Sequence, residues 1–147
     1  MMISTRGRYV LRVLIDLAEH SGGGYVPLKA IAERQDISLK YLEKTFPPLV
    51  KSGYITGMHG KGGGYKLTRK PEEYKVGDIL RITEGDLAPV SCLECHAETC
   101  RHLQECRTRP LWEKLDLLIN AYFDGITLED LLQGQIPDLV LDWKNKK

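Results

Sequence analysis

Residues 27–68 read PLKAIAERQDISLKYLEKTFPPLVKSGYITGMHGKGGGYKLT, and this stretch decides the fold. Its first part holds two helical patterns separated by the polar turn DIS. Pro27 stands at the start of the first pattern, and Ser38 is a favourable N-cap for the second, in which Leu39, Leu42 and Phe46 are expected to point inward. Its second part holds two β-like runs, YIT and YKLT, around a glycine-rich tip, which predicts a hairpin. Two short helices followed by a basic hairpin are typical of a winged helix-turn-helix.

The residues before this stretch predict a longer first helix. Apolar side chains recur at three- and four-residue spacing from Thr5 to His20, and Ser4 or Thr5 is a suitable N-cap. The glycine run at 21–24 then ends the helix. A long helix followed by two short ones is the order expected for the helical part of a winged helix.

Two prolines interrupt the last helical pattern of the decisive stretch. Pro47 and Pro48 each lack a backbone donor and clash with the preceding helical turn, and a residue before proline is pushed away from helical geometry. We therefore expect this helix to end or kink near Phe46, with a further helical turn over Leu49 and Val50.

The second half of the chain predicts three more helices and a polar loop. A short helix is expected over 76–84, ended by Gly85, and a longer one over 110–124. The motif GITLEDLLQG predicts a last short helix capped by Thr127, followed by a tail whose charged end frays. The helix at 110–124 is apolar on more than one side, so we infer a partner chain and hence a homodimer.

These patterns give a fold class and a division of the chain. We expect a mainly α protein with a small β-hairpin wing, built as a winged helix-turn-helix plus a long C-terminal dimerisation helix. The DNA-binding region is expected at 1–74, a short helix and a cysteine-rich sensor loop at 75–109, and the dimerisation helix, short helix and tail at 110–147.

Charge is unevenly distributed along the 147 residues, although the net charge is only +1. Residues 1–70 carry 12 Lys and Arg against 5 Asp and Glu, and residues 71–147 carry 9 against 15. A basic N-terminal half is the electrostatic signature of a protein that meets phosphates, here double-stranded DNA. No run of eighteen apolar residues and no signal peptide is present, which predicts a cytoplasmic protein without a membrane partner.

No motif in the sequence indicates an enzyme. The chain has no constellation of nucleophile and base and no dinucleotide fingerprint. The glycine-rich GKGGGY lacks the Gly-Lys-Ser/Thr ending of a phosphate-binding loop. We therefore expect a binding protein without catalytic residues.

All the cysteines lie within fifteen residues, at Cys92, Cys95, Cys100 and Cys106. In a reducing cytosol, clustered cysteines are more often metal ligands or redox-active thiols than permanent disulfides. The CLEC pair suits a four-cysteine zinc site, although the Cys-x5-Cys half is looser than zinc sites usually have. Iron–sulfur clusters also take three or four thiolates from one loop, and a metal-free redox thiol is a third possibility.

Four motifs resemble one known family over residues 3–132: ISTRGRYVLRVLIDLA, AERQDISLKYLEK, HGKGGGYKLTR and LRITEG. This is the bacterial winged-helix regulator family of the iron–sulfur cluster regulator IscR, the nitric-oxide sensor NsrR and the cysteine-metabolism repressor CymR. The resemblance implies a homodimer with crossing C-terminal helices, a third helix in the major groove and a wing at the minor groove. Carried over by position, the DNA-binding residues are Ser38, Lys40, Tyr41, Glu43, Lys44, His59, Gly60 and Lys61.

The chemistry of these residues fits that role. The hydroxyl and amide of Ser38 can meet a phosphate at the helix N-terminus, and Glu43 can accept a hydrogen bond from a cytosine amino group. The lysines can neutralise phosphates or read guanine. His59 stands where the iron–sulfur regulator has an arginine, and the double proline is atypical of that regulator, so the operator of this protein is expected to differ.

The resemblance also ranks the possible roles of the cysteines. Cys95-x4-Cys100-x5-Cys106 matches the spacing in members that bind a cluster, whose fourth ligand is a histidine three residues after the last cysteine. This chain has Arg109 there, which cannot ligate, so Cys92 is the natural substitute, with His96 or His102 as alternatives. We expect a dimeric regulator whose operator affinity responds to an iron–sulfur cluster, either 2Fe-2S or 4Fe-4S. The alternatives are a zinc-bound or thiol-redox regulator and a zinc-bound adaptor that contacts protein.

Overall fold

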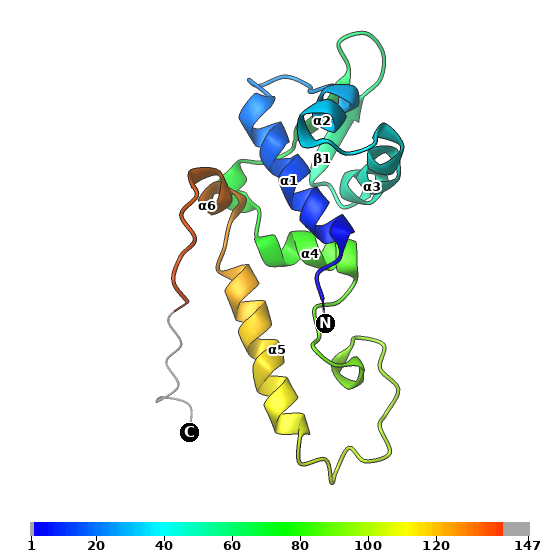
Figure 1. Ribbon diagram of the computed structural model, residues 1–147, viewed down its shortest axis with the longest axis vertical. Helices are drawn as coiled ribbons and strands as arrows, with labels where there is room; N and C mark the ends of the chain where they lie inside the picture. The colour runs from blue at the N-terminus through cyan, green and yellow to red at the C-terminus, as the bar shows by residue number, and fades with distance from the viewer. Residues whose placement is uncertain (1, 140–147) are drawn as a thin grey trace.

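The computed structural model describes residues 2–139. The charged end of the predicted tail, from residue 140 onward, lies outside the described residues. The elements follow in the order α1 (Thr5–His20), α2 (Leu28–Gln35), α3 (Leu39–Lys51), β1 (Ile55–Met58), β2 (Gly64–Leu67), η1 (Pro71–Glu73), α4 (Val76–Glu84), η2 (Ser91–Leu93), α5 (Arg109–Asp124) and α6 (Leu128–Gln133). Helices α1 to α3 and the hairpin form the upper part of the molecule in Figure 1, and α5 extends away below them.

The helix-turn-helix predicted from residues 27–46 is confirmed. Helix α2 begins after Pro27 and ends at Asp36, which takes the left-handed conformation (φ 52°) and so turns the chain sharply. The side chain of Ser38 caps α3 by accepting a hydrogen bond from the amide of Tyr41 over 3.1 Å. Ser4 caps α1 in the same way.

Helix α3 does not end near Phe46, although an end there is one of the two outcomes expected from the prolines. It runs unbroken from Leu39 to Lys51, so the further turn over Leu49 and Val50 belongs to the same helix. The reason lies in the burial pattern: Phe46 and Leu49 are both fully buried, and keeping both in the core requires helical geometry between them. The two prolines are on the exposed side, where carbonyls that have lost their helical donors can be hydrated.

The wing is an antiparallel pair of strands, as predicted, in register from Ile55 opposite Leu67 to Met58 opposite Gly64. Tyr65 fixes the wing to the rest of the domain. Its backbone exchanges hydrogen bonds of 2.8 and 2.9 Å with Val26, just before α2. Its ring also packs edge-on against Phe46 of α3, with centroids 4.6 Å apart.

Two apolar clusters hold the chain together. The larger joins α1, α2, α3, the wing and Tyr74, with Leu14, Leu42 and Phe46 fully buried. Leu39, expected to point inward with Leu42 and Phe46, is instead 40% exposed at the first position of α3. The smaller consists of Val76, Leu80, Leu87 and Ile126, and it joins α4 to the segment that follows α5. Helix α4 ends at Gly85 (φ 80°), as predicted, and the chain then enters the cysteine loop, residues 86–108.

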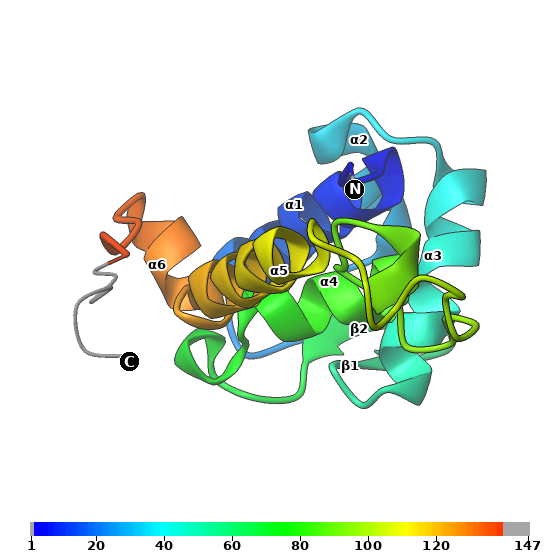
Figure 2. The same ribbon diagram turned by 90° about the horizontal axis from the view of Figure 1, so that it is seen from below.

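Helix α5 is largely open to solvent. It lies across α4, as Figure 2 shows, and none of its residues is fully buried. Leu111 and Leu117 are 58% and 67% exposed. The helix after it, α6, begins with a reciprocal capping box between Thr127 and Asp130, which confirms the predicted cap. None of the described helices is both long and apolar enough to cross a bilayer.

Candidate nucleic-acid interface and cysteine loop

Four of the predicted DNA-binding residues meet on the outer face of α3. Ser38, Lys40, Tyr41 and Lys44 line one shallow, open hollow, and the two lysines make no ion pair within the described residues. Glu43 is exposed on the same helix but does not line the hollow. An open surface with unpaired cations and a hydroxyl at a helix N-terminus suits the phosphates and groove edges of a duplex.

A buried polar network holds α2, the helix that precedes α3 in the chain, against α1. Asp16 of α1 is fully buried and accepts hydrogen bonds from Nη2 and Nε of Arg34 (2.6 and 3.0 Å) and from the side-chain amide of Gln35 (2.8 Å). Burial alone would raise the pKa of Asp16, but the hydrogen bonds from Arg34 and Gln35 and the charges of Arg34 and His20 outweigh it and lower the pKa below 3.8. The carboxylate therefore stays ionised and holds α2 against α1.

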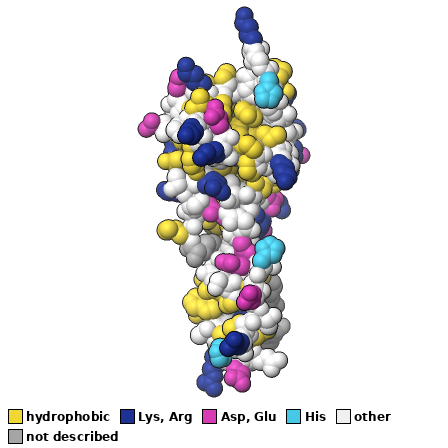
Figure 3. Space-filling model, turned by 90° about the vertical axis from the view of Figure 1, so that its right-hand side faces the viewer, with side chains coloured by type: hydrophobic (Ala, Val, Ile, Leu, Met, Phe, Trp, Pro, Cys, Tyr) yellow, Lys and Arg dark blue, Asp and Glu magenta, His cyan; other side chains and the backbone are white. Residues whose placement is uncertain are grey.

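The wing residues His59, Gly60 and Lys61 are all exposed at the hairpin tip. The tip is a tight turn in which the amide of Gly63 donates to the carbonyl of Gly60 over 3.0 Å, and Gly60 has a positive φ of 93°. Basic side chains protrude at this end of the molecule and over the face on the α3 side (Figure 3). The hairpin tip and the α3 hollow are separate surfaces, and a single DNA duplex is large enough to contact both.

The four cysteines lie on the loop between α4 and α5 with free thiols, Cys95 and Cys100 exposed and Cys92 and Cys106 half-buried. Asp86 anchors the start of this loop by accepting hydrogen bonds from the amides of Cys95 (2.8 Å) and Ala88 (2.6 Å). Its contact with the Cys95 thiol lowers the pKa of Asp86 and raises the pKa of Cys95.

Cys106 has the opposite environment. The hydroxyl of Thr108 lies 3.4 Å from its sulfur, and this contact, with the amides of Thr108 and Arg109, lowers the pKa of Cys106. The side chain of Arg109 is turned away to Glu113, to which it donates over 2.6 Å. Arg109 thus forms an ion pair within the first turn of α5.

The donor chemistry of the loop suits a thiolate-bound metal or cluster, but the thiols are not assembled. Among residues 2–139, no three His, Cys, Asp or Glu side chains lie close enough to hold one metal ion. The loop from 94 to 108 is almost free of regular structure, and most of it is exposed. Ligation by all four cysteines therefore requires this loop to close on itself.

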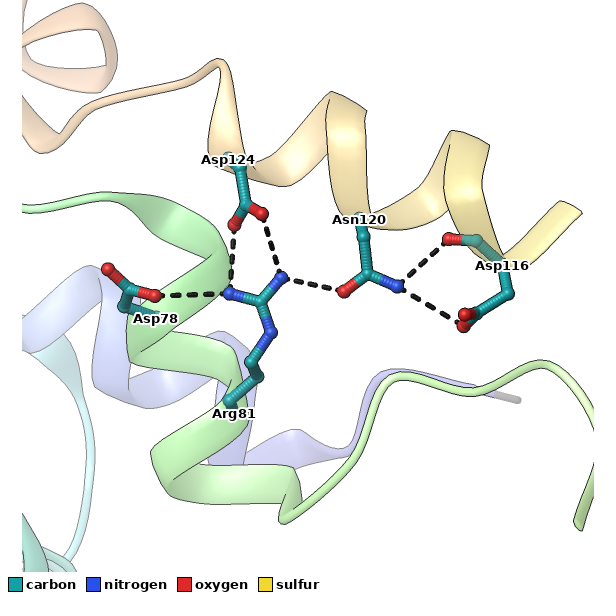
Figure 4. A network of polar contacts seen from close by, with 5 residues as sticks. All are labelled: Asp78, Arg81, Asp116, Asn120 and Asp124. Carbon is teal, nitrogen blue, oxygen red and sulfur yellow. Dashed lines mark hydrogen bonds and ion pairs between the residues drawn. The ribbon is translucent and has the colours of Figure 1, made fainter. Parts of the chain in front are cut away.

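Sequence reasoning missed the polar network that joins α4 to α5, shown in Figure 4. Arg81 of α4 donates to both carboxylate oxygens of Asp124 (2.9 and 3.0 Å), to Asn120 (2.6 Å) and to Asp78 (3.1 Å). Asn120 in turn donates to Asp116. The signal that could have revealed it is the four-residue spacing of Asp116, Asn120 and Asp124 on one side of an apolar helix.

A second missed contact joins α4 to the start of α1. Glu84 accepts hydrogen bonds from the amide (3.1 Å) and hydroxyl (2.7 Å) of Ser4, eighty residues earlier in the chain. Gly7 lies against the same carboxylate, where a Cβ atom would collide with Glu84. Helix α4 is therefore fixed to both α1 and α5.

Comparison with known proteins gives concordant matches over most of the chain. The Rrf2 family, described as an iron-dependent transcriptional regulator, matches residues 3–134. The HTH-type transcriptional regulator IscR of Aliivibrio salmonicida (strain LFI1238) is 38% identical over 146 residues, 99% of this chain and 85% of that protein. The structure of CymR, the global cysteine regulator of B. subtilis, matches with a TM-score of 0.76 at 34% identity over 92% of this chain and 98% of its own. T. potens IscR matches with a TM-score of 0.70 at 38% identity, covering 91% and 88%.

Proposed function

The chain belongs to the Rrf2 family of transcriptional regulators, and on that premise we propose that it is a homodimeric DNA-binding regulator whose operator affinity responds to a cysteine-ligated iron–sulfur cluster. Membership confirms the motif resemblance and the winged-helix fold class. It also agrees with the expectation of a protein that is not an enzyme, because the relatives are named as transcriptional regulators.

The observation that carries the proposal is the outer face of α3. Lys40 and Lys44 stand unpaired beside Ser38 and Tyr41 around one open hollow, and the wing tip supplies a second exposed basic point at Lys61. Within the described residues, neither lysine pairs with Glu43, and Lys44, its neighbour in sequence, does not face it on the helix. Their freedom leaves them available for phosphates, with Glu43 available for base readout.

Dimerisation is proposed from the exposure of α5. Four large apolar side chains of this helix lie between 36% and 67% exposed: Leu111, Leu115, Leu117 and Tyr122. By helical periodicity, Leu111, Leu115 and Tyr122 lie on one side of α5, whereas Leu117 lies off that stripe. A second copy of α5 packed on the face of Leu111, Leu115 and Tyr122 would remove a contiguous apolar surface from water.

The cluster is proposed to bind at Cys92, Cys95, Cys100 and Cys106, with Cys92 in the place of the ligand that Arg109 cannot supply. Such a cluster would make the loop sensitive to oxygen and nitric oxide. The protein contributes four thiols, a lowered pKa at Cys106 that favours its thiolate, and a loop free to close.

A path from the loop to the DNA face supports the proposed response. Asp86 binds the amide of Cys95 immediately after α4 ends, and α4 is bonded to α1 through Glu84 and to α5 through Arg81. Closing the loop would pull on Asp86 and thereby on α4. A change in how the two winged helices are presented would then change operator affinity by favouring one of two states.

The test is preparation without oxygen, followed by an absorption spectrum, iron, sulfide and zinc analysis, and titration of an operator enriched from random duplexes. We expect iron and sulfide with a visible band, and a change in affinity on cluster removal that is lost in the Cys100→Ser and Cys106→Ser variants. Cys92→Ser separates a four-cysteine set from a three-cysteine one.

The same measurement decides the alternative. The CLEC pair of Cys92 and Cys95 favours zinc as the second candidate. A colourless protein with one zinc per chain would replace the cluster by zinc. A metal-free protein whose affinity changes on thiol oxidation would make it a thiol sensor, and DNA affinity indifferent to all three states would refute any response through the loop.

A further inference from the structure

A small hollow lies where the start of α1, the middle of α3 and the end of α4 meet. Its volume is about 110 Å³, and it is lined by Arg6 of α1, by Lys44, Thr45 and Pro48 of α3, and by Ile82 and Thr83 of α4. None of the expected DNA-binding residues except Lys44 belongs to it. We call it the Arg6 hollow.

The charge in the Arg6 hollow is uncompensated. The side chains of Arg6 and Lys44 make no hydrogen bond or ion pair within residues 2–139, and no acidic side chain lines the hollow. The carboxylate that follows Thr83, Glu84, is engaged by the amide and hydroxyl of Ser4. Two cations converging on one concave site with no anion attract an anionic ligand.

The size of the Arg6 hollow and the chemistry of its lining residues restrict the class of ligand that it can bind. The volume holds a few water molecules or one phosphate-sized anion and is too small for a nucleotide. The hydroxyls of Thr45 and Thr83 already donate to the carbonyls of Tyr41 (2.9 Å) and Leu80 (3.0 Å), so the cations supply the attraction. Guanidinium groups match the tetrahedral oxygens of phosphate especially well.

The Arg6 hollow adjoins the face proposed to meet DNA. Lys44 lines both the Arg6 hollow and the hollow formed with Ser38, Lys40 and Tyr41, so the two share one wall. A duplex strand that passes the N-terminal half of α3 would bring its next phosphates toward Arg6.

We propose that the Arg6 hollow binds a phosphate group, supplied either by the DNA backbone flanking the major-groove contacts or by a free phosphate ion. For the DNA source the inference rests on the proposed function. A phosphate held there would bridge α1, α3 and α4, and α4 is the helix that ends at the cysteine loop.

The first arm of the test measures duplex binding by the full chain. The probe is a mixed-sequence duplex of about 30 base pairs titrated at several chloride concentrations. Arg6→Ala should weaken binding and reduce the slope of log K against log salt by about one phosphate per bound protomer, and Arg6→Lys should restore most of it. The control Lys75→Ala removes the same charge from the far end of α4, where Lys75 is exposed and unpaired, and should leave the slope nearly unchanged.

The second arm titrates inorganic phosphate into the free protein and follows the amide resonances of Thr45 and Thr83. Saturable shifts that Arg6→Ala abolishes support a site for free phosphate. A lower salt slope without such shifts supports a backbone phosphate. An Arg6→Ala variant with the slope of the control and with unaltered phosphate shifts, or with none in either protein, overturns the inference. Wild-type protein that binds no duplex at low salt refutes the proposed function and leaves the phosphate titration to decide the hollow.

Discussion

Arg81 of α4 and Asp124 of α5 form a two-pronged ion pair in which each terminal nitrogen of the guanidinium meets one carboxylate oxygen, over 2.9 and 3.0 Å. Hydrogen bonding to Asp124 raises the pKa of Arg81, so the guanidinium stays charged at any physiological pH. The same guanidinium holds Asn120 one turn earlier on α5. The orientation of α5 relative to the winged-helix part of the chain is thus set by this side-chain geometry in addition to apolar packing.

Breaking this pair should loosen α5 at a modest cost in stability. Arg81 and Asp124 are 33% and 39% exposed, so solvent screens the charges, and we expect a coupling free energy of about 1 kcal/mol. A double-mutant cycle with Arg81→Gln and Asp124→Asn in urea unfolding measures it. Lysine keeps the charge but loses the fork, so a second cycle in the Arg81→Lys background should give a smaller coupling to Asp124. A coupling near zero would mean that apolar contacts alone orient α5.

Asp16→Asn should be far more damaging, because Asp16 is fully buried and surrounded by donors. The amide group of asparagine would turn a donor toward Arg34 or Gln35 and leave the guanidinium without its buried partner. We expect a loss of about 3 kcal/mol in the free energy of unfolding, together with weaker DNA binding as α2 shifts. Glu33→Gln changes an exposed residue of α2 beside Arg34; it is the control and should cost almost nothing in the free energy of unfolding.

The same carboxylate should make stability depend on acidity. Because the native pKa of Asp16 lies below its unfolded value near 3.8, its contribution is complete above that pH and is lost as the pH falls toward the native pKa. The difference in unfolding free energy between the wild type and Asp16→Asn should therefore be constant near neutral pH and shrink below about pH 4. A difference that grows on acidification would contradict the assigned direction of the shift.

The fold was largely predictable because its signals are local. Helical spacing, the caps at Ser4, Ser38 and Thr127, and the glycine-rich hairpin each appear within a few neighbouring residues. The prolines led to the wrong prediction that α3 could end near Phe46. The burial of Phe46 and Leu49, which keeps the helix going, is a tertiary effect that no local sequence rule contains.

The candidate site was predictable only in part. The exposed residues of α3 follow from helix periodicity, but which cations find partners depends on residues far apart in the chain. The link from Ser4 to Glu84 spans eighty residues, and Arg6 and Lys44 line one hollow because α1, α3 and α4 come together there. Whether the cysteines come together depends on a loop with almost no regular structure, which spacing alone does not determine.

Replacing both Pro47 and Pro48 by alanine should stabilise the protein. Helix α3 already has helical geometry at these exposed positions, so alanine restores two backbone donors without changing the buried residues. We expect a gain of about 2 kcal/mol in urea unfolding, less than the full helix-interior penalty of two prolines because proline also restricts the unfolded chain. The single exposed change Val50→Ala is a suitable control. A loss of stability in the double variant would show that the prolines fit a conformation that alanine does not favour.

Two wing glycines should respond differently to alanine. A Cβ at Gly64 would collide with the backbone of Val26, whereas one at Gly62 would meet nothing within 4 Å and suffer only the strain of a φ of 77°. We expect Gly62→Ala to cost about 1 kcal/mol and Gly64→Ala clearly more, with displacement of the wing from Val26. Urea unfolding and the amide shift of Tyr65 report both effects. Equal costs would mean that the wing can move off Val26 freely.

Leu111→Glu should separate the proposed dimer without unfolding the protomer. Leu111 lies on the face proposed for dimerisation, is 58% exposed and makes no contribution to either apolar cluster, so a glutamate there is harmless to a single chain. In a dimer that buries this face, the change removes a leucine contact and places a charge in the interface, and self-association should weaken by at least about tenfold. Sedimentation equilibrium measures the association, and circular dichroism confirms that the helices persist. Lys114→Glu, also exposed on α5, alters charge by more while removing no apolar side chain, and it should have the smaller effect. Equal association of both variants and the wild type would place the interface elsewhere than on this face of α5.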